Sequence, residues 1–198
     1  MELYLIRHGE SEANALDLHS GWSPVDLTEE GRAQARGAHE LLAGAVFDRI
    51  YVSDVKRAQQ TARIVFPEAE FTYCTLIREL DNTAMRGKSA QDMLKLFPDK
   101  YPACRRAFDY APLTGLDCES GAHLRSRAAA FLRLVRDSGC ERSAAVCHAG
   151  FIRACAAHIL DTPTHNPPLV CMNASVSVLM FVREKWRVKA WNITGGLL

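Results

Sequence analysis

Short apolar segments alternate with amphipathic ones along most of this chain, and this alternation restricts the folds open to it. Residues 3–6, 47–53, 71–75 and 143–147 are typical of strands, because each run is too short for a buried helix. Helical patterns lie between them and beyond the last one. Strands separated by helices favour a mainly parallel sheet covered on both faces. We therefore expect a three-layer α/β/α sandwich, with the final hairpin adding an antiparallel edge strand.

Two helices carry clear start signals. Thr28 is suited to the N-cap position, and the two acids after it stand where the helix dipole favours negative charge. The apolar residues that follow predict one buried stripe, made of Ala33, Ala35, Ala38, Leu41 and Leu42. Ser120 or Glu119 caps a second helix, which we expect to run to Asp137.

The length of 198 residues predicts a single domain over residues 1–198. The stretch from Ile77 to Leu116 is the least periodic and contains Pro98, Pro102 and Pro112. We expect short helices there that cover a crevice. This segment, at about 80–118, is called the cap below.

Charge and cysteine content narrow the function classes. The net charge of +1 gives no overall field that would attract nucleic acid or a membrane, so an anion site must be a local cluster of arginines. Seven scattered cysteines without a C-x-x-C pair fit reduced thiols in the cytoplasm. No apolar stretch reaches transmembrane length. We expect a cytoplasmic protein that binds neither nucleic acid nor membrane.

Charged and polar side chains follow the predicted strands where the strands end. Arg7 and His8 follow the first strand, Arg57 opens the helix after the second, Glu79 stands past the third and His148 follows the fourth. The carboxyl ends of parallel strands share one crevice. Arginine suits phosphate oxygens, and histidine is a nitrogen nucleophile with a pKa near neutrality. The pattern therefore indicates phosphoryl chemistry.

Each of these residues also has a structural interpretation. Arg57 could be a solvated side chain, Glu79 a surface ion-pair partner, and His148 a helix cap. For Arg127 a structural role is the favoured interpretation, in which its side chain ties the helix to a loop. A zinc site is a less favoured alternative, because no histidine or cysteine pair has ligand spacing; it would use His8, His148, Glu79 and Cys147. No P-loop is present.

Taken together, these segments resemble the histidine phosphatase superfamily, also called the phosphoglycerate mutase-like or two-histidine phosphatases. The matching motifs are Leu5-Ile6-Arg7-His8-Gly9-Glu10-Ser11, Arg57-Ala58 with Thr61-Ala62, Arg78-Glu79, Glu119-Ser120 with Arg127, and His148 with Gly150 and Arg153. The resemblance covers most of the chain. It implies a phosphoglycerate mutase-like fold and a phosphoric monoester hydrolase of the phosphatase branch.

The resemblance also implies residue roles. His8 would attack phosphorus and become a phosphohistidine. Glu79 would protonate the leaving oxygen and then deprotonate the hydrolytic water. The phosphoryl oxygens would be bound by Arg7, Arg57, Asn14 and a protonated His148. Because these groups supply the charge that Mg²⁺ supplies elsewhere, no metal or cofactor is implied.

Substrate contacts are expected from residues around that centre. Residues 19–26 look like the family's substrate loop, which includes Ser20 and Gly21. Arg86 stands where the family often has an acid, and would add positive charge at the rim. Ala149 stands where many members have glycine. These four residues complete the predicted substrate-binding set.

Hydrolysis is favoured over phosphate transfer because the segment between Glu79 and Glu119 is only about 40 residues long. Related mutases carry a longer cap there. We expect a metal-independent phosphomonoesterase for a small phosphate ester, of the α-ribazole phosphate or sugar-phosphate type, in a monomer or homodimer. The alternatives are a phosphoglycerate mutase-type phosphotransferase and a non-catalytic module that binds phosphate or phosphoproteins.

Overall fold

A six-stranded sheet forms the centre of the protein in the computed structural model, which describes residues 1–113 and 116–195. The strands are ordered β3-β2-β4-β1-β5-β6. Their bounds are β1 Glu2–Arg7, β2 Arg49–Val52, β3 Thr72–Tyr73, β4 Arg142–Cys147, β5 Val176–Val182 and β6 Lys185–Ile193. β1, β2, β3 and β4 pair in parallel, whereas β5 pairs antiparallel with both β1 and β6. The predicted mainly parallel sheet with antiparallel pairing at one edge is confirmed.

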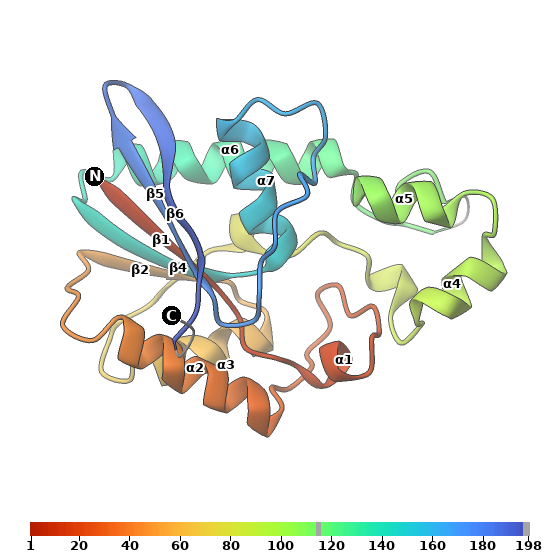
Figure 1. The fold of residues 1–198 in the computed structure, drawn as a ribbon, viewed down its shortest axis with the longest axis horizontal. Helices are drawn as coiled ribbons and strands as arrows, with labels where there is room; N and C mark the ends of the chain where they lie inside the picture. Colours follow the sequence, from red (N-terminus) through yellow and green to blue (C-terminus); the bar gives the residue numbers. More distant parts are fainter. Residues whose placement is uncertain (114–115, 196–198) are drawn as a thin grey trace.

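Helices cover both faces of this sheet (Figure 1). α2 (Glu29–Leu41) and α3 (Lys56–Val65) pack on one face, and α6 (Gly121–Asp137) and α7 (Ala149–Ile159) on the other. Side chains of β1 alternate between the two cores: Leu3 and Leu5 join the cluster under α6 and α7, and Ile6 joins the one under α2 and α3. The three-layer sandwich follows from this two-sided burial.

Helix starts agree with the sequence signals. The Thr28 hydroxyl accepts a hydrogen bond from Gly31 N at 2.9 Å, and Ser120, not Glu119, caps α6. The predicted stripe of α2 is only partly correct. Ala35, Ala38 and Leu42 are buried, but Ala33 and Leu41 are exposed. Ala33 lies roughly half a turn from Ala35, which puts it on the solvent side of the helix.

The cap holds the expected short helices. After the 3₁₀ turns η1 (Thr75–Ile77) and η2 (Thr83–Met85) come α4 (Ala90–Leu96) and α5 (Tyr101–Ala107). α4 and α5 form a lobe to one side of the sheet (Figure 1). Buried residues of this segment, such as Met93 and Tyr101, belong to the same apolar cluster as α6 and α7. The lobe is therefore anchored to the main core.

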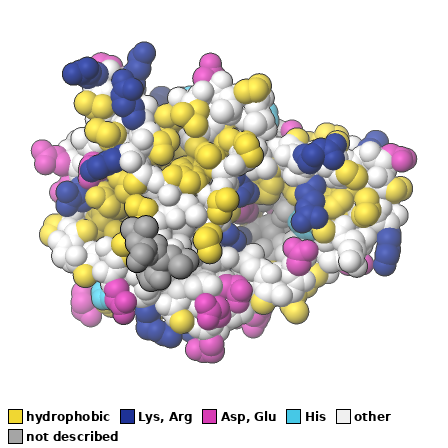
Figure 2. Space-filling model, in the orientation of Figure 1, with side chains coloured by type: hydrophobic (Ala, Val, Ile, Leu, Met, Phe, Trp, Pro, Cys, Tyr) yellow, Lys and Arg dark blue, Asp and Glu magenta, His cyan; other side chains and the backbone are white. Residues whose placement is uncertain are grey.

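Figure 2 shows a hollow between this lobe and the body of the sheet, with Lys or Arg side chains at its wall. α1 (Glu12–Ala15), which follows β1, lies below it in the same view as Figure 1. Within residues 1–113 and 116–195, no helix has the length and apolarity needed to cross a bilayer.

Candidate active site

His8 lies at the carboxyl end of β1 with its ring orientation fixed. Nδ1 donates to the Gly9 carbonyl oxygen at 2.7 Å, so Nε2 carries the lone pair. The Arg57 Nε donates to that Nε2 at 3.1 Å. Burial, followed by the charges of Arg57 and Arg7, holds the pKa of His8 well below its ordinary value. His8 is therefore a neutral imidazole with an available nitrogen nucleophile.

Arg57 links both histidines. From the first turn of α3 its Nη2 donates to the Gly21 carbonyl oxygen at 2.9 Å and faces His148 Nδ1 at 3.2 Å. The side chain is buried, and burial lowers its pKa to about 10. No carboxylate within residues 1–113 and 116–195 forms an ion pair with it. A buried guanidinium at a helix N-terminus needs a compensating anion.

His148 ends β4 and begins α7. Its Nε2 lies 2.9 Å from the Ser53 hydroxyl. Because Arg57 can only donate, Nδ1 accepts, and the ring proton belongs on Nε2. Burial and the charge of Arg57 hold the pKa of His148 well below its ordinary value. Without a bound anion these surroundings favour the neutral ring, whose centroid lies 5.1 Å from that of His8. The expected protonation of His148 in the presence of phosphate stays a prediction.

Arg7 supplies a second guanidinium, on a side chain that is partly buried. Its Nη1 donates to the Cys171 carbonyl oxygen at 2.6 Å, and its buried Nε has no partner among the described residues. Burial lowers its pKa, whereas the negative charge of Glu79 acts in the opposite direction. Arg7 and Arg57 each lower the pKa of His8. Two cations thus converge on the nucleophile.

Glu79 is held by backbone amides. Its two carboxylate oxygens accept from Leu80 N at 2.8 Å and from Gly150 N at 3.2 Å. A Cβ on Gly150 would stand 2.2 Å from Glu79 Oε1, so only glycine lets α7 approach this closely. The surface ion pair with Arg78 does not form, because Arg78 pairs with Asp54 instead.

The other residues predicted to bind substrate lie at different distances from the two histidines. Gly21 accepts from Arg57, and the Ser20 carbonyl oxygen accepts from Ser23 N at 2.8 Å in the same loop. Ala149 is the first residue of α7 and is buried. Arg86 is exposed at the end of η2, and no contact joins it to either histidine among the described residues.

Asn14 is connected to His8 through a third residue. Its Oδ1 accepts from the Ser11 backbone nitrogen at 3.2 Å and from Asn173 Nδ2 at 3.4 Å. That same Nδ2 lies 3.1 Å from the His8 carbonyl oxygen. The Asn14 oxygen is therefore engaged within the protein, and the role of its amide nitrogen as a donor to phosphate stays a prediction.

Sequence reasoning assigned no role to two supporting hydroxyls, those of Ser53 and Thr61. Ser53 ends β2 and contacts His148, so the criterion of polar residues at strand ends would have found it. Thr61 accepts from Gly9 N at 3.0 Å and donates to the Arg57 carbonyl oxygen at 2.7 Å. It thereby joins the loop after β1 to α3. No pattern in the sequence pairs these two segments.

The predicted tie from Arg127 to a loop is confirmed. Arg127 donates to the carbonyl oxygens of Leu76, Arg78 and Glu79 at 2.6, 3.0 and 3.1 Å. Glu119 pairs with the same guanidinium at 2.7 Å, and both side chains are largely buried. The Trp22 indole also donates to the Glu79 carbonyl oxygen at 2.8 Å. The backbone that carries the Glu79 carboxylate is thus fixed from two sides.

The zinc alternative finds no support in the geometry. Within residues 1–113 and 116–195 no group of three or more His, Cys, Asp or Glu side chains is arranged to hold a metal ion. Cys147 is packed in the apolar cluster under α6 and α7, where burial raises its pKa well above the ordinary value. That burial keeps it a neutral thiol.

Comparisons with known proteins agree with this site. Residues 3–194 match the sequence profile of the histidine phosphatase superfamily, branch 1. An adenosylcobalamin/alpha-ribazole phosphatase of Salmonella typhi is 34% identical over 168 residues, covering 82% of this chain and 81% of that protein. A 2,3-bisphosphoglycerate-dependent phosphoglycerate mutase of Nocardia farcinica is 38% identical over 118 residues, covering 56% of this chain and 48% of the mutase.

Solved structures of related proteins share this fold. The structure of the alpha-ribazole phosphatase from Shigella flexneri superposes with a TM-score of 0.83 at 26% identity, covering 98% of this chain and 96% of that one. A mycobacterial glucosyl-3-phosphoglycerate phosphatase superposes with a TM-score of 0.82 at 28% identity, over 96% and 98% of the two chains. This chain therefore belongs to the histidine phosphatase superfamily, branch 1, and is an enzyme of that family.

Proposed function

We propose that the protein is a metal-independent phosphomonoesterase that acts through a phosphohistidine on a small phosphorylated metabolite. The observation that carries the proposal is the state of His8: Nδ1 is committed to the Gly9 carbonyl, so Nε2 is a neutral nucleophile. Arg57 and Arg7 act on the same ring. Phosphoryl transfer needs such positioning and charge stabilisation more than covalent work by the protein.

In the first step, His8 Nε2 attacks phosphorus as the bond to the ester oxygen breaks. Glu79, in its acid form, gives its proton to the departing alcohol oxygen. Arg7 and Arg57 bind the phosphoryl oxygens. His148 Nδ1 becomes a donor if it takes a proton, which the negative phosphate favours because it opposes the charge of Arg57.

In the second step, Glu79 takes a proton from water as the water oxygen attacks phosphorus and the bond to His8 Nε2 breaks. Inorganic phosphate leaves, and His8 is again neutral. The amides of Leu80 and Gly150 keep the carboxylate in place through both steps. Glu79 therefore alternates between acid and base without moving from its hydrogen-bonded position.

Similarity to the alpha-ribazole phosphatases supports hydrolysis of a small phosphate ester, of the α-ribazole phosphate or sugar-phosphate type. Phosphoglycerate mutase activity remains the second candidate, because the matched mutase is 38% identical over the shared part. A module that only binds phosphate would not need an acid at residue 79, so the presence of Glu79 argues against this third alternative.

The test is phosphate release from a panel of esters by wild type and His8→Ala. The panel contains p-nitrophenyl phosphate, α-ribazole phosphate, fructose 6-phosphate and 3-phosphoglycerate. Turnover of at least one ester by wild type, with its loss in the variant, is the expected result. Isomerisation of 3-phosphoglycerate without hydrolysis would favour the mutase, and phosphate binding without any turnover would favour the binding module.

A further inference from the structure

We propose that Trp22 is a positioning residue for the proposed acid, and that it acts on Glu79 through the peptide group between residues 79 and 80. The inference rests on the proposed function, because it takes Glu79 as the acid and the base of the two steps. The Trp22 indole Nε1 donates to the Glu79 carbonyl oxygen at 2.8 Å. From the other end of the same peptide group, Leu80 N donates to Glu79 Oε1 at 2.8 Å. One rigid unit therefore joins the indole to the carboxylate.

This peptide group passes the orientation of its carbonyl on to its N–H. It is planar and trans, so its C=O and N–H bonds point in opposite directions. A donor that fixes the carbonyl therefore also fixes the N–H that holds the carboxylate. Hydrogen bonds in such a series also polarise one another, so a bond to the carbonyl strengthens the donor at the other end. Loss of the indole bond should thus loosen the Glu79 carboxylate without direct contact.

Arg127 is the second donor to the Glu79 carbonyl oxygen, at 3.1 Å. The same guanidinium also binds the carbonyl oxygens of Leu76 and Arg78 and pairs with Glu119. Its removal would therefore disturb a whole loop. Among the described residues, the Trp22 side chain makes a single hydrogen bond, the one to Glu79. A substitution at residue 22 is for this reason the more specific test.

The indole ring is itself held by a cation. The Arg78 guanidinium lies over the Trp22 ring, 4.5 Å from its centroid. Arg78 donates to both carboxylate oxygens of Asp54, from Nε to Oδ1 at 2.7 Å and from Nη2 to Oδ2. Such a two-point pair fixes the plane of the guanidinium. Ser53, the neighbour of Asp54, contacts His148 at 2.9 Å. The segment after β2 therefore supports both the acid and the second histidine.

Trp22 and Arg127 line a cavity of about 510 Å³. Neither His8 nor His148 is among its lining residues, so these two donors act from outside the catalytic centre. The Trp22 side chain is half-buried. A smaller ring at this position enlarges an existing cavity and opens no new void in the closed core. We therefore expect Trp22→Phe to fold.

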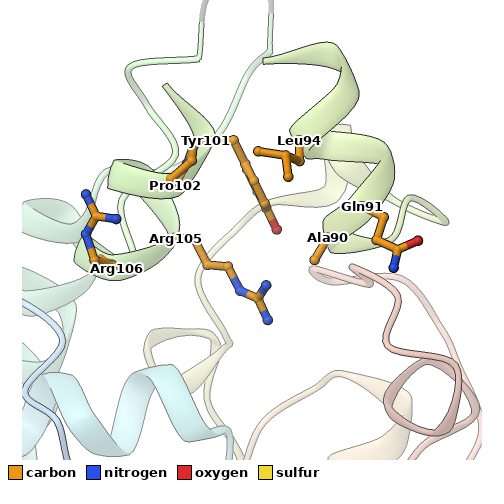
Figure 3. A pocket seen from close by; sticks show the side chains of 7 residues that line it. All are labelled: Ala90, Gln91, Leu94, Tyr101, Pro102, Arg105 and Arg106. Atoms are coloured by element: carbon orange, nitrogen blue, oxygen red, sulfur yellow. The ribbon is translucent and has the colours of Figure 1, made fainter. Parts of the chain in front are cut away.

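The cap helices α4 and α5 lie apart from this set of hydrogen bonds. Figure 3 shows a second cavity, of about 500 Å³, that is lined by residues of these two helices, such as Tyr101. Within residues 1–113 and 116–195, no residue that lines it forms a hydrogen bond with Trp22, Glu79 or Leu80. A substitution at residue 22 should therefore act on the acid and not through the cavity of the cap.

The experiment compares two esters of similar size that differ in leaving group, p-nitrophenyl phosphate and phenyl phosphate. Phenolate is the poorer leaving group, so cleavage of phenyl phosphate depends more on the proton from Glu79. Trp22→Phe removes the indole donor and keeps an aromatic ring under Arg78. We expect kcat/KM to fall about tenfold for phenyl phosphate and less than about twofold for p-nitrophenyl phosphate. The ratio of the two values does not depend on the fraction of folded enzyme.

Matched variants assign this change in ratio to the contact. Trp191→Phe is the control, because its indole also donates to a backbone carbonyl oxygen, that of Val170, at 2.6 Å. It should leave the ratio unchanged. Arg78→Met keeps the indole but removes the cation over it, and should change the ratio in the same direction by about threefold. Its control is Arg125→Met, which removes a comparable ion pair with Asp161.

A double variant tests whether Trp22 acts through the acid. In a Glu79→Gln background, Trp22→Phe should leave the ratio of the two kcat/KM values as it is, because no acid remains to be positioned. A change in ratio that persists in this background would overturn the inference. Equal slowing of both esters by Trp22→Phe in the otherwise wild-type enzyme would overturn it as well.

Hydrogen exchange at the Leu80 amide, followed by NMR, tests the contact without turnover. Exchange should be at least about threefold faster in Trp22→Phe, because the bond from Leu80 N to the carboxylate weakens, and unchanged in Trp191→Phe. The proposed function fails by a different result. Wild type that hydrolyses no phosphate ester, while Leu80 exchanges faster in Trp22→Phe, would refute the phosphatase mechanism and leave the coupling between indole and carboxylate standing.

Discussion

At the residue scale, the chemistry depends on which ring nitrogen of each histidine carries the lone pair. In His8 it is Nε2, because Nδ1 donates to Gly9, and in His148 it is Nδ1, because Nε2 donates to Ser53. Both of these nitrogens accept from Arg57. The position of these residues at strand ends was predictable from the sequence. The burial that most strongly lowers the pKa of both rings was not, since it arises only when distant segments pack together.

Replacing Glu79, the proposed acid, should slow hydrolysis to an extent that depends on how much protonation the leaving group needs. Glu79→Gln cannot protonate the departing oxygen, so hydrolysis of an alkyl phosphate should slow by about 10²–10⁴-fold. p-Nitrophenyl phosphate, whose leaving group needs little protonation, should slow far less. Steady-state kcat/KM for both esters checks this, and equal slowing of the two would refute the acid role.

The pH dependence should follow the cations around His8. Only neutral His8 is a nucleophile, and its pKa is held well below the ordinary value, so kcat/KM should persist below about pH 6.5. Arg57→Gln removes one of the two cations, which raises the pKa of His8 and moves the acidic limb to higher pH. Profiles with p-nitrophenyl phosphate measure the shift, and Arg63→Gln on the same helix is the control. An unmoved limb would contradict the electrostatic argument.

At the scale of elements, helices hold the site together. Arg57 lies in the first turn of α3, and His148 and Gly150 lie at the start of α7. Arg127, from the second turn of α6, binds the backbone of Glu79. Cap residues such as Thr28 and Ser120 were predictable because their signals are local. The exposed Ala33 shows the limit of such signals: small residues fit either side of a helix, and only the neighbours decide.

The start of α7 tolerates no side chain at residue 150. In Gly150→Ala the new Cβ would clash with Glu79 and Phe108. We expect a loss of about 1–3 kcal/mol in the free energy of unfolding and a lower kcat. Gly37→Ala, in the interior of α2 with its nearest contact at 3.7 Å, should be neutral or slightly stabilising. Thermal unfolding of both variants checks the difference, and similar Tm changes would show that the clash is relieved.

At the scale of the whole molecule, the sheet directs four strand ends to one crevice. The alternation of strands and helices predicts this arrangement because parallel strands need crossover helices. β5 lies next to the edge strand β6 and runs antiparallel to β1. Its place beside β1 is set by pairing between residues far apart in the sequence, which no local pattern predicts. The orientation of the α4–α5 lobe likewise depends on contacts of Met93 and Tyr101 with the core, which no local pattern encodes.

Metal removal tests whether the arginines, without a metal ion, supply the positive charge that the transferred phosphoryl group needs. Because arginines are proposed to stabilise the transferred phosphoryl group, dialysis against EDTA should leave kcat/KM for p-nitrophenyl phosphate unchanged. The control is the same enzyme dialysed against buffer alone. Activity that is lost on chelation and restored by zinc would reinstate a metal site.

The closeness of Arg7 and Arg57 has a consequence for folding. Arg57 is buried within reach of the charge of Arg7, and desolvation lowers the pKa of both guanidinium groups. The unfolded chain has no such pair, so an anion that binds between them shifts the folding equilibrium by mass action. Inorganic phosphate at 100 times its Kd should add about 2.7 kcal/mol, a Tm increase absent in chloride of equal ionic strength. The product of the reaction would then also be a thermal protectant of the enzyme that releases it.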